Sequence, residues 1–396
     1  MLKDVIAPGD VRVAPTRYTP ARSPLRIALV APPWFELPPK GYGGIEAMLF
    51  WLVQGLVARG HDVTLIGAGE DHTGARFLPT YAEPPTAKLG QSFPEVIHAL
   101  TATEYLDELE VDVLHDHTLA GPLLLRGTRI PAIVTSHGPI TGELAEYYRM
   151  INRYARLVAI SEFQRTRAPH LQWAGMVHNA IPVAEYPFQA KKEEFVLFLG
   201  RMSAEKSPDL AIKAARAAGR EIVVAAKCNE PAEHEYFEQR VRPLLGPDAH
   251  WFGEADSKQK KELLAQAHCL VFPIQWDEPF GIVMVEAMAC GTPVVALRRG
   301  SVPEVVRDGL TGWIRDDPAK LPAAIERAGE LDPWRCRSWV ADNFDVSGMV
   351  SGYEAIFRRA LLALPVGGLT PQAGLTESPG QAPAGRVRRS LKVQRA

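Results

Sequence analysis

Two glutamates, Glu278 and Glu286, stand eight positions apart in the segment 276–293, around the start of a predicted helix. Pro279 follows Glu278 and favours a loop before the helix, whereas Glu286 would lie about two turns into it. A carboxylate accepts hydrogen bonds from two hydroxyls, so Glu286 suits a ribose diol and Glu278 a sugar hydroxyl. The first helical turn adds unpaired N–H groups that can bind a phosphate, those of Phe280, Gly281 and Ile282.

The competing interpretation of these glutamates is structural. Glu278 would then complement the helix dipole, and Glu286 would be a solvated helix residue. The neighbours of Glu286 are apolar, however: Val283, Val285, Ala287 and Met288. A carboxylate among them would be costly to bury without a hydrogen-bonding partner. We therefore favour a binding role for both glutamates.

A pair of cations, Arg201 and Lys206, follows a predicted strand and precedes a predicted helix. Arginine offers a planar fork of donors and lysine a point charge, so that together they suit a diphosphate. The alternative is that both are surface cations paired with Glu205 or Asp209, because exposed ion pairs are frequent.

A glycine-rich turn occupies residues 40–46, between the first predicted strand and the first predicted helix. Gly41, Gly43 and Gly44 allow a ligand to approach the backbone closely, and the N-terminus of the helix favours negative charge. The pattern is not G-x-G-x-x-G, so it does not predict a dinucleotide site. A tight turn without a ligand is the alternative.

A further polar segment, Arg-Gly-Ser-Val-Pro-Glu over 299–304, follows another predicted strand. It could wrap a sugar or a phosphate, and we count Ser301 among the donor-binding residues. The alternative is an ordinary strand-to-helix loop in which Glu304 caps the helix.

Three histidines lie at the ends of two predicted strands. His115 and His117 flank Asp116, and His137 follows the next strand. The first two face the same side, but no third ligand is evident, so we expect a polar lining and no metal site. His137 is either a loop histidine satisfied by its neighbours or a residue of the reaction site.

The elements that position these residues alternate between strand and helix in both halves of the chain. Residues 26–31 and 62–67 predict strands around a helix over 45–59, which is a βαβ unit of a parallel sheet. Further strands are predicted over 111–115, 132–136 and 157–160 and, after a proline-containing linker at 179–194, over 194–199, 222–226, 251–253, 270–273 and 294–296. Helices are predicted over 208–218, 258–267 and 283–289. The pattern predicts two doubly wound α/β domains with ligands at the carboxyl ends of their strands.

The composition excludes several classes of protein. Hydrophobic residues make up 46% and charged residues 23% of the 396 residues, as in globular proteins. The net charge of −2 lacks the basic surplus of a nonspecific nucleic-acid binder. The four cysteines form no C-x-x-C pair, and no apolar run approaches the ~18 residues of a membrane span. Because the N-terminus has no hydrophobic signal core, we expect a cytoplasmic protein with reduced thiols.

The two ends of the chain differ from the middle. Residues 1–24 lack periodicity and are predicted to be a flexible extension. Residues 365–396 contain nine glycines and prolines and are predicted to be a disordered tail. Five Lys and Arg against one Glu give this tail a charge of +4. It either solubilises the protein or makes peripheral contact with anionic lipids at the inner membrane face.

Taken together, the motifs resemble those of the retaining glycosyltransferases of family 4. They are Gly-Gly-Ile-Glu at 43–46, Gly-Arg-x4-Lys at 200–206, the two glutamates with seven residues between them, Gly-Thr-Pro-Val-Val at 291–295 and Gly-Ser-Val-Pro-Glu-Val-Val at 300–306. The resemblance covers residues 25–364 and implies the GT-B fold, in which two Rossmann-like doubly wound domains face a central cleft. It implies an acceptor-binding domain over 25–186, a nucleotide-sugar domain over 187–349 and a last helix over 350–364 that packs back on the first domain.

The resemblance also implies a role for each motif. Arg201 and Lys206 would stabilise the departing diphosphate, Glu278 would lie by the donor sugar, and Glu286 would bind the ribose. His137 would lie near the reaction centre. The remaining donor contacts would come from Gly43, Gly44, Phe280, Gly281 and Ile282. The chain departs from the family at 178–181, His-Asn-Ala-Ile, where the family often has Asn-Gly.

The implied reaction moves a hexose from a nucleotide-diphosphate sugar to an acceptor hydroxyl with retention of configuration. UDP-glucose is the first expectation for the donor and GDP-mannose the second, and the acceptor could be a glycan, a lipid or a small metabolite. No cofactor beyond the nucleotide-sugar co-substrate is expected. The alternatives on the same fold are a non-catalytic nucleotide-sugar-binding protein and another sugar-phosphate enzyme.

Overall fold

The computed structural model describes residues 23–41 and 43–362. All of them belong to one compact unit, residues 1–366, and the second unit, 367–396, lies outside the described part. The predictions of a flexible extension over 1–24 and of a disordered basic tail therefore fall almost wholly outside the described residues.

The first sheet carries the N-terminal half of the chain. Its strands are β1 (Arg26–Val30), β2 (Asp62–Ala68), β3 (Arg76–Tyr81), β4 (Val113–Asp116), β5 (Ala132–Ser136), β6 (Arg156–Ala159) and β7 (Trp173–Met176). They are parallel and lie in the order β3-β2-β1-β4-β5-β6-β7. Along β1, Ile27 and Leu29 enter one buried cluster and Ala28 and Val30 enter another. Both faces of the sheet are therefore covered, as the apolar strands predict.

The second sheet repeats this arrangement. Its strands are β8 (Val196–Arg201), β9 (Ile222–Lys227), β10 (Ala249–Gly253), β11 (Cys269–Phe272), β12 (Val294–Leu297) and β13 (Gly312–Arg315). They are parallel in the order β10-β9-β8-β11-β12-β13. Leu197 packs in one cluster and its neighbours Val196 and Phe198 pack in another. Two Rossmann-like α/β domains are thus present, which confirms the predicted fold class.

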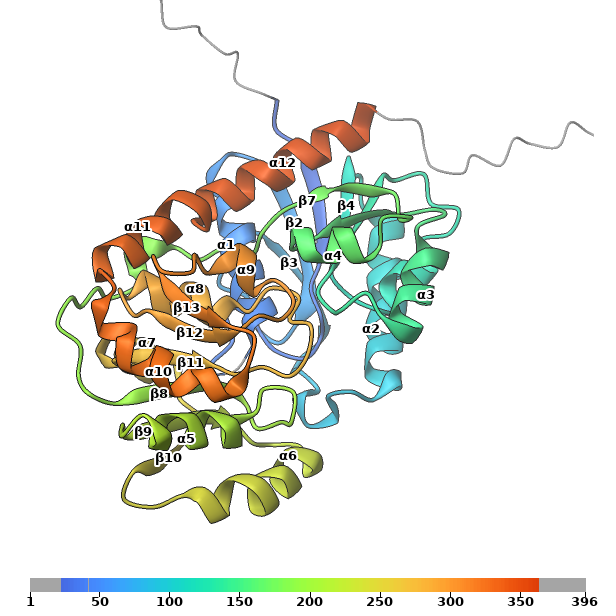
Figure 1. Cartoon of the computed structure of the whole chain (residues 1–396). Helices are drawn as coiled ribbons and strands as arrows, with labels where there is room; N and C mark the ends of the chain where they lie inside the picture. The colour runs from blue at the N-terminus through green and yellow to red at the C-terminus, as the bar shows by residue number, and fades with distance from the viewer. Residues whose placement is uncertain (1–22, 42, 363–396) are drawn as a thin grey trace, which may run out of the picture. The chain divides into compact units, whose positions relative to one another are not determined.

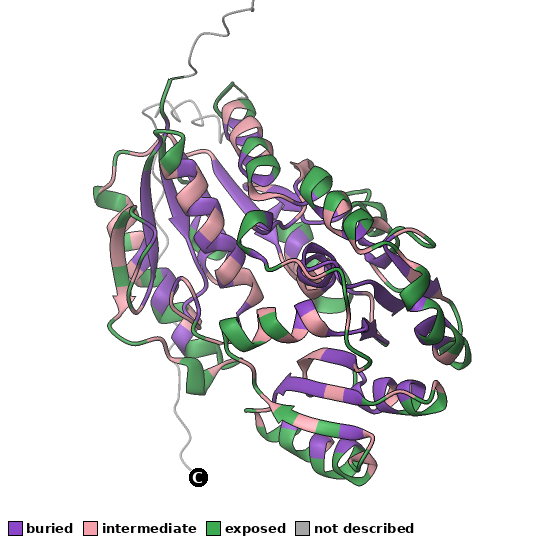
Figure 2. Cartoon of the chain, turned by 90° about the vertical axis from the view of Figure 1, so that its left-hand side faces the viewer, coloured by how far each residue is buried: buried purple, intermediate pink, exposed green. Residues whose placement is uncertain are grey.

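Helices surround both sheets (Figure 1), and Figure 2 shows their exposed outer faces around the buried strands. They are α1 (Gly44–Ala58), α2 (Ser92–Glu108), α3 (Gly142–Ile151), α4 (Glu162–Arg167), α5 (Pro208–Ala217), α6 (Pro231–Tyr236), α7 (Ser257–Gln266), α8 (Ile282–Ala289), α9 (Val302–Val305), α10 (Leu321–Glu326), α11 (Pro333–Asn343) and α12 (Val346–Leu362). Within the described ranges, none of these helices combines the length and the apolarity needed to cross a bilayer.

The last described helix, α12, joins the end of the chain to the first sheet. It contacts α1, β4 and β7 (Figure 1). Tyr353, Ile356 and Phe357 are buried in the same cluster as the β1 side chains. The family resemblance implied a last helix over 350–364, and the observed helix begins four residues earlier, at Val346.

Strands at the sheet edges were the hardest to predict. The sequence indicated most of the inner strands within about two residues of their observed bounds, but it did not indicate β3, β7 or β13. All three lie at an edge, where one side lacks a neighbouring strand; β3 and β7 contain no buried residue, and β13 alternates buried with half-buried residues. Without a continuous apolar run such a strand has little periodic signal.

Candidate active site

Two cavities meet at the loops that carry the predicted site residues. The first has a volume of about 490 Å³ and the second about 440 Å³, and each is lined by residues of both sheets' domains. The residues common to both linings are Gly44, Arg201, Lys206, Lys227, Glu278, Gly281 and Ile282. Six of these seven lie in loops or at the ends of strands and helices of the second domain. A bound molecule in one cavity would therefore contact a molecule in the other at these side chains.

Lys206 and Glu278 form a buried ion pair at this junction. The Lys206 ammonium donates to Oε2 of Glu278, and the Trp276 indole N–H donates to the same oxygen over 2.8 Å. The ammonium also lies 5.0 Å from the centre of the Trp276 ring. Only 14% of the Lys206 side chain and 9% of the Glu278 side chain are exposed. Oε1 of Glu278 receives no hydrogen bond from any described residue and remains available to a hydroxyl.

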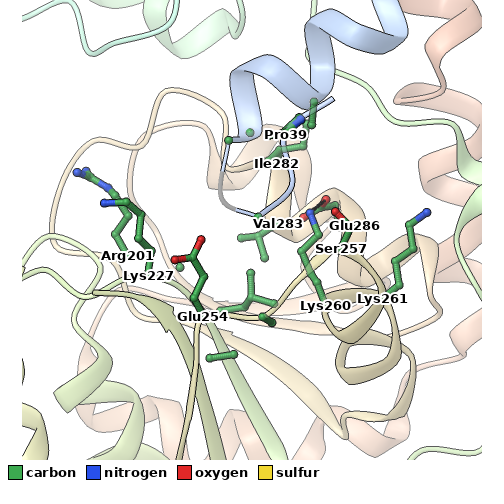
Figure 3. Close-up of a pocket in the computed structure, with 18 of the residues that line it drawn as sticks. Pro39, Arg201, Lys227, Glu254, Ser257, Lys260, Lys261, Ile282, Val283 and Glu286 are labelled. Carbon is green, nitrogen blue, oxygen red and sulfur yellow. Dashed lines mark hydrogen bonds and ion pairs between the residues drawn. The ribbon is translucent and has the colours of Figure 1, made fainter. Parts of the chain in front are cut away.

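Arg201 ends strand β8 and lies directly beside Lys227, the last residue of β9 (Figure 3). Its guanidinium is 3.3 Å from Glu205, which is the surface pair considered above, yet the side chain is two-thirds buried and lines both cavities. Lys227 is almost fully buried and pairs with Glu230 and, over 3.1 Å, with Glu233. Three cations therefore converge at the ends of adjacent elements.

Lys227 was not predicted as a site residue. Its position could have identified it, because Lys227 directly follows the apolar run 222–226. Parallel sheets bind ligands at the carboxyl ends of their strands. The strand was predicted to end at Ala226, one residue short of its observed end at Lys227.

Glu286 lies inside α8, where its side chain is 6% exposed. The Tyr186 hydroxyl donates to Oε1 over 2.8 Å, and the Lys260 ammonium donates to the same oxygen over 2.6 Å (Figure 3). These partners remove the cost of an unpaired buried charge. Oε2 receives no hydrogen bond from a described residue, so it can accept from a diol in the first cavity.

The start of α8 lies at the junction of the cavities. Gly281 precedes the helix with φ of 76°, and Gly281 and Ile282 line both cavities. Phe280 is buried and lines only the second. The first-turn N–H groups of α8 therefore lie near the three cations, which suits an anion.

The glycine turn of the first domain lies across from α8. A side chain at Gly43 would have its Cβ 2.8 Å from Pro39, and φ there is 148°, so the turn requires glycine. Gly44 begins α1, and a Cβ at this position would be 3.4 Å from Ile282. Glu46, in the first turn of α1, is buried in the second cavity, and burial raises the pKa of its carboxyl to about 7.

Ser301 does not line either cavity. Its hydroxyl donates to the carbonyl of Phe280 over 2.9 Å, and its N–H donates to the carbonyl of Glu278 over 2.9 Å. The next charged residue, Glu304, accepts from the N–H of Glu162 at the start of α4 and from His178. The segment expected to wrap the ligand instead supports the 278–280 loop and ties it to the first domain.

The three histidines form a hydrogen-bonded chain at the wall of the second cavity, which His117 and His137 line. Nε2 of His115 is 2.8 Å from the Thr135 hydroxyl, Nδ1 of His115 is 3.2 Å from Nε2 of His117, and Nδ1 of His117 is 2.8 Å from Nε2 of His137. Thr135 in turn contacts the Tyr353 hydroxyl of α12. Nδ1 of His137 is buried and has no partner among the described residues. Among these residues, no group of three or more His, Cys, Asp or Glu could hold a metal ion.

We expect these three imidazoles to stay neutral well below the usual histidine pKa. Burial lowers the pKa of His115 to about 3 and that of His137 to about 4, and it lowers the pKa of His117 as well. In the unfolded chain the same groups bind protons below about pH 6.5. Their contribution to stability is therefore lost as the pH falls from about 6.5 to about 4, because protons bind the unfolded state first.

NMR titration of the imidazole resonances checks this expectation, with the exposed histidines of the same chain as an internal reference. The three buried rings should keep the ring-nitrogen shifts of neutral imidazole between pH 7.5 and pH 5, whatever smaller change the ionisation of Asp116 causes; conversion to the shifts of imidazolium with a midpoint near 6.5 would contradict the buried chain. Resonances are a better readout than overall stability, because burial raises the pKa of neighbouring Asp116 to about 7 and gives a contribution of opposite sign.

Both halves of the chain match models of known glycosyltransferase families. Residues 42–183 match the family model described as Glycosyltransferase Family 4, and residues 185–336 match the model described as Glycosyl transferases group 1. A phosphatidyl-myo-inositol mannosyltransferase of Propionibacterium freudenreichii is 26% identical over 328 residues, which cover 73% of this chain and 81% of that protein. A D-inositol 3-phosphate glycosyltransferase of Acidothermus cellulolyticus is 32% identical over 185 residues, which cover 42% of this chain and 41% of that protein.

Solved structures share the same architecture. A glycosyltransferase involved in avilamycin A biosynthesis is 25% identical with a TM-score of 0.69 and covers 86% of this chain and 99% of its own. A sucrose-phosphate synthase from Thermosynechococcus elongatus is 20% identical with a TM-score of 0.71, and the match covers 85% of this chain and 99% of that protein. Anabaena HepE in complex with UDP and glucose is 18% identical with a TM-score of 0.67, and the match covers 85% of this chain and 100% of that protein. The last two likenesses show the fold alone.

Proposed function

Because this chain is a glycosyltransferase with the GT-B fold, we propose that it transfers a hexose from a nucleoside-diphosphate sugar to an acceptor hydroxyl with retention of configuration. The observation that carries this proposal is the meeting of the two cavities at Arg201, Lys206 and Glu278. A donor in the first cavity and an acceptor in the second would come together at these groups. UDP-glucose is the first donor to test and GDP-mannose the second.

The first cavity suits the nucleotide. The free oxygen of Glu286 accepts the ribose diol, and Arg201, Lys206 and Lys227 face the diphosphate together with the first-turn N–H groups of α8. Such preorganised donors stabilise the charge that builds on a departing phosphate. Gly43 and Gly44 allow the first domain to approach the phosphates closely.

The sugar would lie where the cavities join. Oε1 of Glu278 would accept from a sugar hydroxyl while Lys206 and Trp276 hold Oε2. The acceptor hydroxyl attacks the anomeric carbon on the face from which the diphosphate leaves, and its proton passes to the departing phosphate oxygen. His137 lines the second cavity, and its unpartnered Nδ1 would orient a hydroxyl. In this scheme the cations and the helix start neutralise the diphosphate without a metal.

A thermal-shift screen with UDP, GDP and ADP sugars tests the donor half of the proposal. A ligand at 100 times its dissociation constant stabilises a protein by about 2.7 kcal/mol, so one nucleotide class should raise the Tm clearly above the others. The same donor should be hydrolysed slowly in the absence of acceptor. Binding without hydrolysis or transfer would favour the alternative of a non-catalytic nucleotide-sugar binder. The anomeric configuration of the product, read by NMR, decides between retention and inversion.

A further inference from the structure

Part of the second cavity is lined by residues that do not line the first cavity, and in the proposed function this part would hold the acceptor. We call it the acceptor compartment and define it as those residues that line the second cavity but not the first. One part of this lining is formed by aromatic and leucine side chains, which we call the aromatic wall: Trp34, Phe35, Leu119, Leu144, Tyr148 and Trp276. This inference rests on the proposed function and addresses the chemical class of the acceptor.

The charges of the acceptor compartment are all of one sign. Its described lining includes Glu46 and Glu95 but neither lysine nor arginine. The lining cations Arg201, Lys206 and Lys227 lie at the junction, where the donor diphosphate would occupy them. A phosphate or carboxylate on the acceptor would therefore be buried beside two carboxyl groups with no cation to pair with it, which is costly.

The histidines do not supply the missing positive charge. His117 and His137 line the compartment. Both nitrogens of His117 and Nε2 of His137 already take part in the hydrogen-bonded chain of histidines. A chain of imidazoles that donate and accept in sequence is satisfied when every ring is neutral. Burial also lowers the pKa of both rings, so protonation at neutral pH does not convert them into an anion site.

Two buried polar atoms in the compartment have no partner among the described residues. They are Nδ1 of His137 and Oδ1 of Asn179, a residue that is 7% exposed. A buried polar atom of this kind calls for a hydrogen bond from a ligand or water. The amide oxygen of Asn179 accepts only, so it calls for a donor such as a hydroxyl.

We propose that the acceptor is an uncharged polyhydroxyl compound with an apolar face, such as a neutral sugar or glycoside, and not a phosphorylated one. Its hydroxyls would bond to His137 and Asn179, and its apolar face would pack on the aromatic wall. The reactive hydroxyl would then point toward the three cations at the junction.

Matched pairs of acceptors test this proposal on the full-length protein, with the donor chosen by the thermal-shift screen. Each pair consists of a neutral compound and its phosphate, for example phenyl β-D-glucoside and its 6-phosphate, or glucose and glucose 6-phosphate. We expect a neutral member to raise nucleotide release above the hydrolysis rate, with kcat/KM at least about 100-fold above that of its phosphate. A preference for the phosphate overturns the proposal.

Binding provides a readout that does not depend on finding the natural acceptor. Trp34 and Trp276 line the compartment, so we expect phenyl β-D-glucoside to change the tryptophan fluorescence of the UDP-saturated protein saturably. Its dissociation constant should be at least about tenfold lower than that of its 6-phosphate. Equal or tighter binding of the phosphate, or no saturable binding of the neutral glycoside, overturns the proposal.

A variant separates the compartment from the donor site. Asn179→Leu removes the free amide oxygen at similar volume, and it should weaken phenyl glucoside binding about tenfold while leaving the UDP-induced thermal shift unchanged. Asn343→Leu, outside both linings, is the control. If no nucleotide sugar shifts the Tm of the native protein or is hydrolysed, the proposed function fails; if donor binding and hydrolysis are intact but the phosphorylated acceptors are preferred, only this inference fails.

Discussion

Replacing Lys206 by alanine should lower donor-dependent turnover about 10²- to 10³-fold, which is the usual loss when one preorganised donor to a developing negative charge is removed. Lys206 is more buried than Arg201, the other predicted cation, and lies where both cavities meet. The measurement is nucleotide release with and without acceptor at saturating donor. Because the interaction strengthens as the phosphate departs, we expect kcat to fall more than donor affinity.

Lys213→Ala is the matched control for this variant. Lys213 lies on α5, its side chain is half exposed, and it pairs with Asp209 outside both cavities. Its loss should leave turnover unchanged and change stability by less than about 1 kcal/mol. Unchanged turnover in Lys206→Ala, with intact folding, would remove the basis for assigning the diphosphate to these cations.

Gly300→Ala should reduce turnover about 100-fold although the new methyl group touches no ligand. A Cβ at position 300 would lie 2.2 Å from the carbonyl oxygen and 2.4 Å from the nitrogen of Glu278. The backbone that carries the Glu278 carboxylate would have to move, and a displacement of about 1 Å in a reacting site costs roughly that factor. Turnover and the UDP-induced thermal shift are measured together, because Glu286 and the first cavity should still bind UDP.

Gly219→Ala controls for backbone strain. Gly219 has φ of +66°, close to the +54° of Gly300, but nothing lies within 4 Å of a Cβ there. Both variants should lose stability of the order of 1 kcal/mol from the strained φ, whereas only Gly300→Ala should lose activity. Equal turnover in the two variants would show that the 299–301 segment does not position Glu278.

The fold was predictable from the sequence because its inner strands are buried on both faces and its helices end at clear signals. The run Ala132–Ser136 has the predicted bounds, and α1, Gly44–Ala58, lies within one residue of the helix predicted over 45–59. The edge strands gave no such signal, since half-buried residues need not be apolar. The packing of α12 on the first sheet was expected only from the family resemblance.

The chemistry of the site divides in the same way. Residue types and spacing alone indicated the paired glutamates, the cations Arg201 and Lys206 and the glycine turn, because phosphate and hydroxyl binding require those groups next to helix starts and strand ends. The partners of these residues come from distant parts of the chain: Tyr186 and Lys260 on Glu286, and Lys227 beside Arg201. Sequence spacing carries no information on such contacts.

The sequence by itself determined that the chain forms two parallel α/β domains and that Arg201 and Lys206 lie at the carboxyl end of a strand of the second domain. Local propensities and hydrophobic periodicity are sufficient for both, because they act within one element and its neighbours. Only the tertiary structure decided that Ser301 supports a loop, that three histidines form one hydrogen-bonded chain, and that the acceptor compartment has no lysine or arginine in its described lining. These properties depend on which side chains from separate segments share a buried space, where desolvation and unpaired hydrogen-bonding atoms determine what can bind.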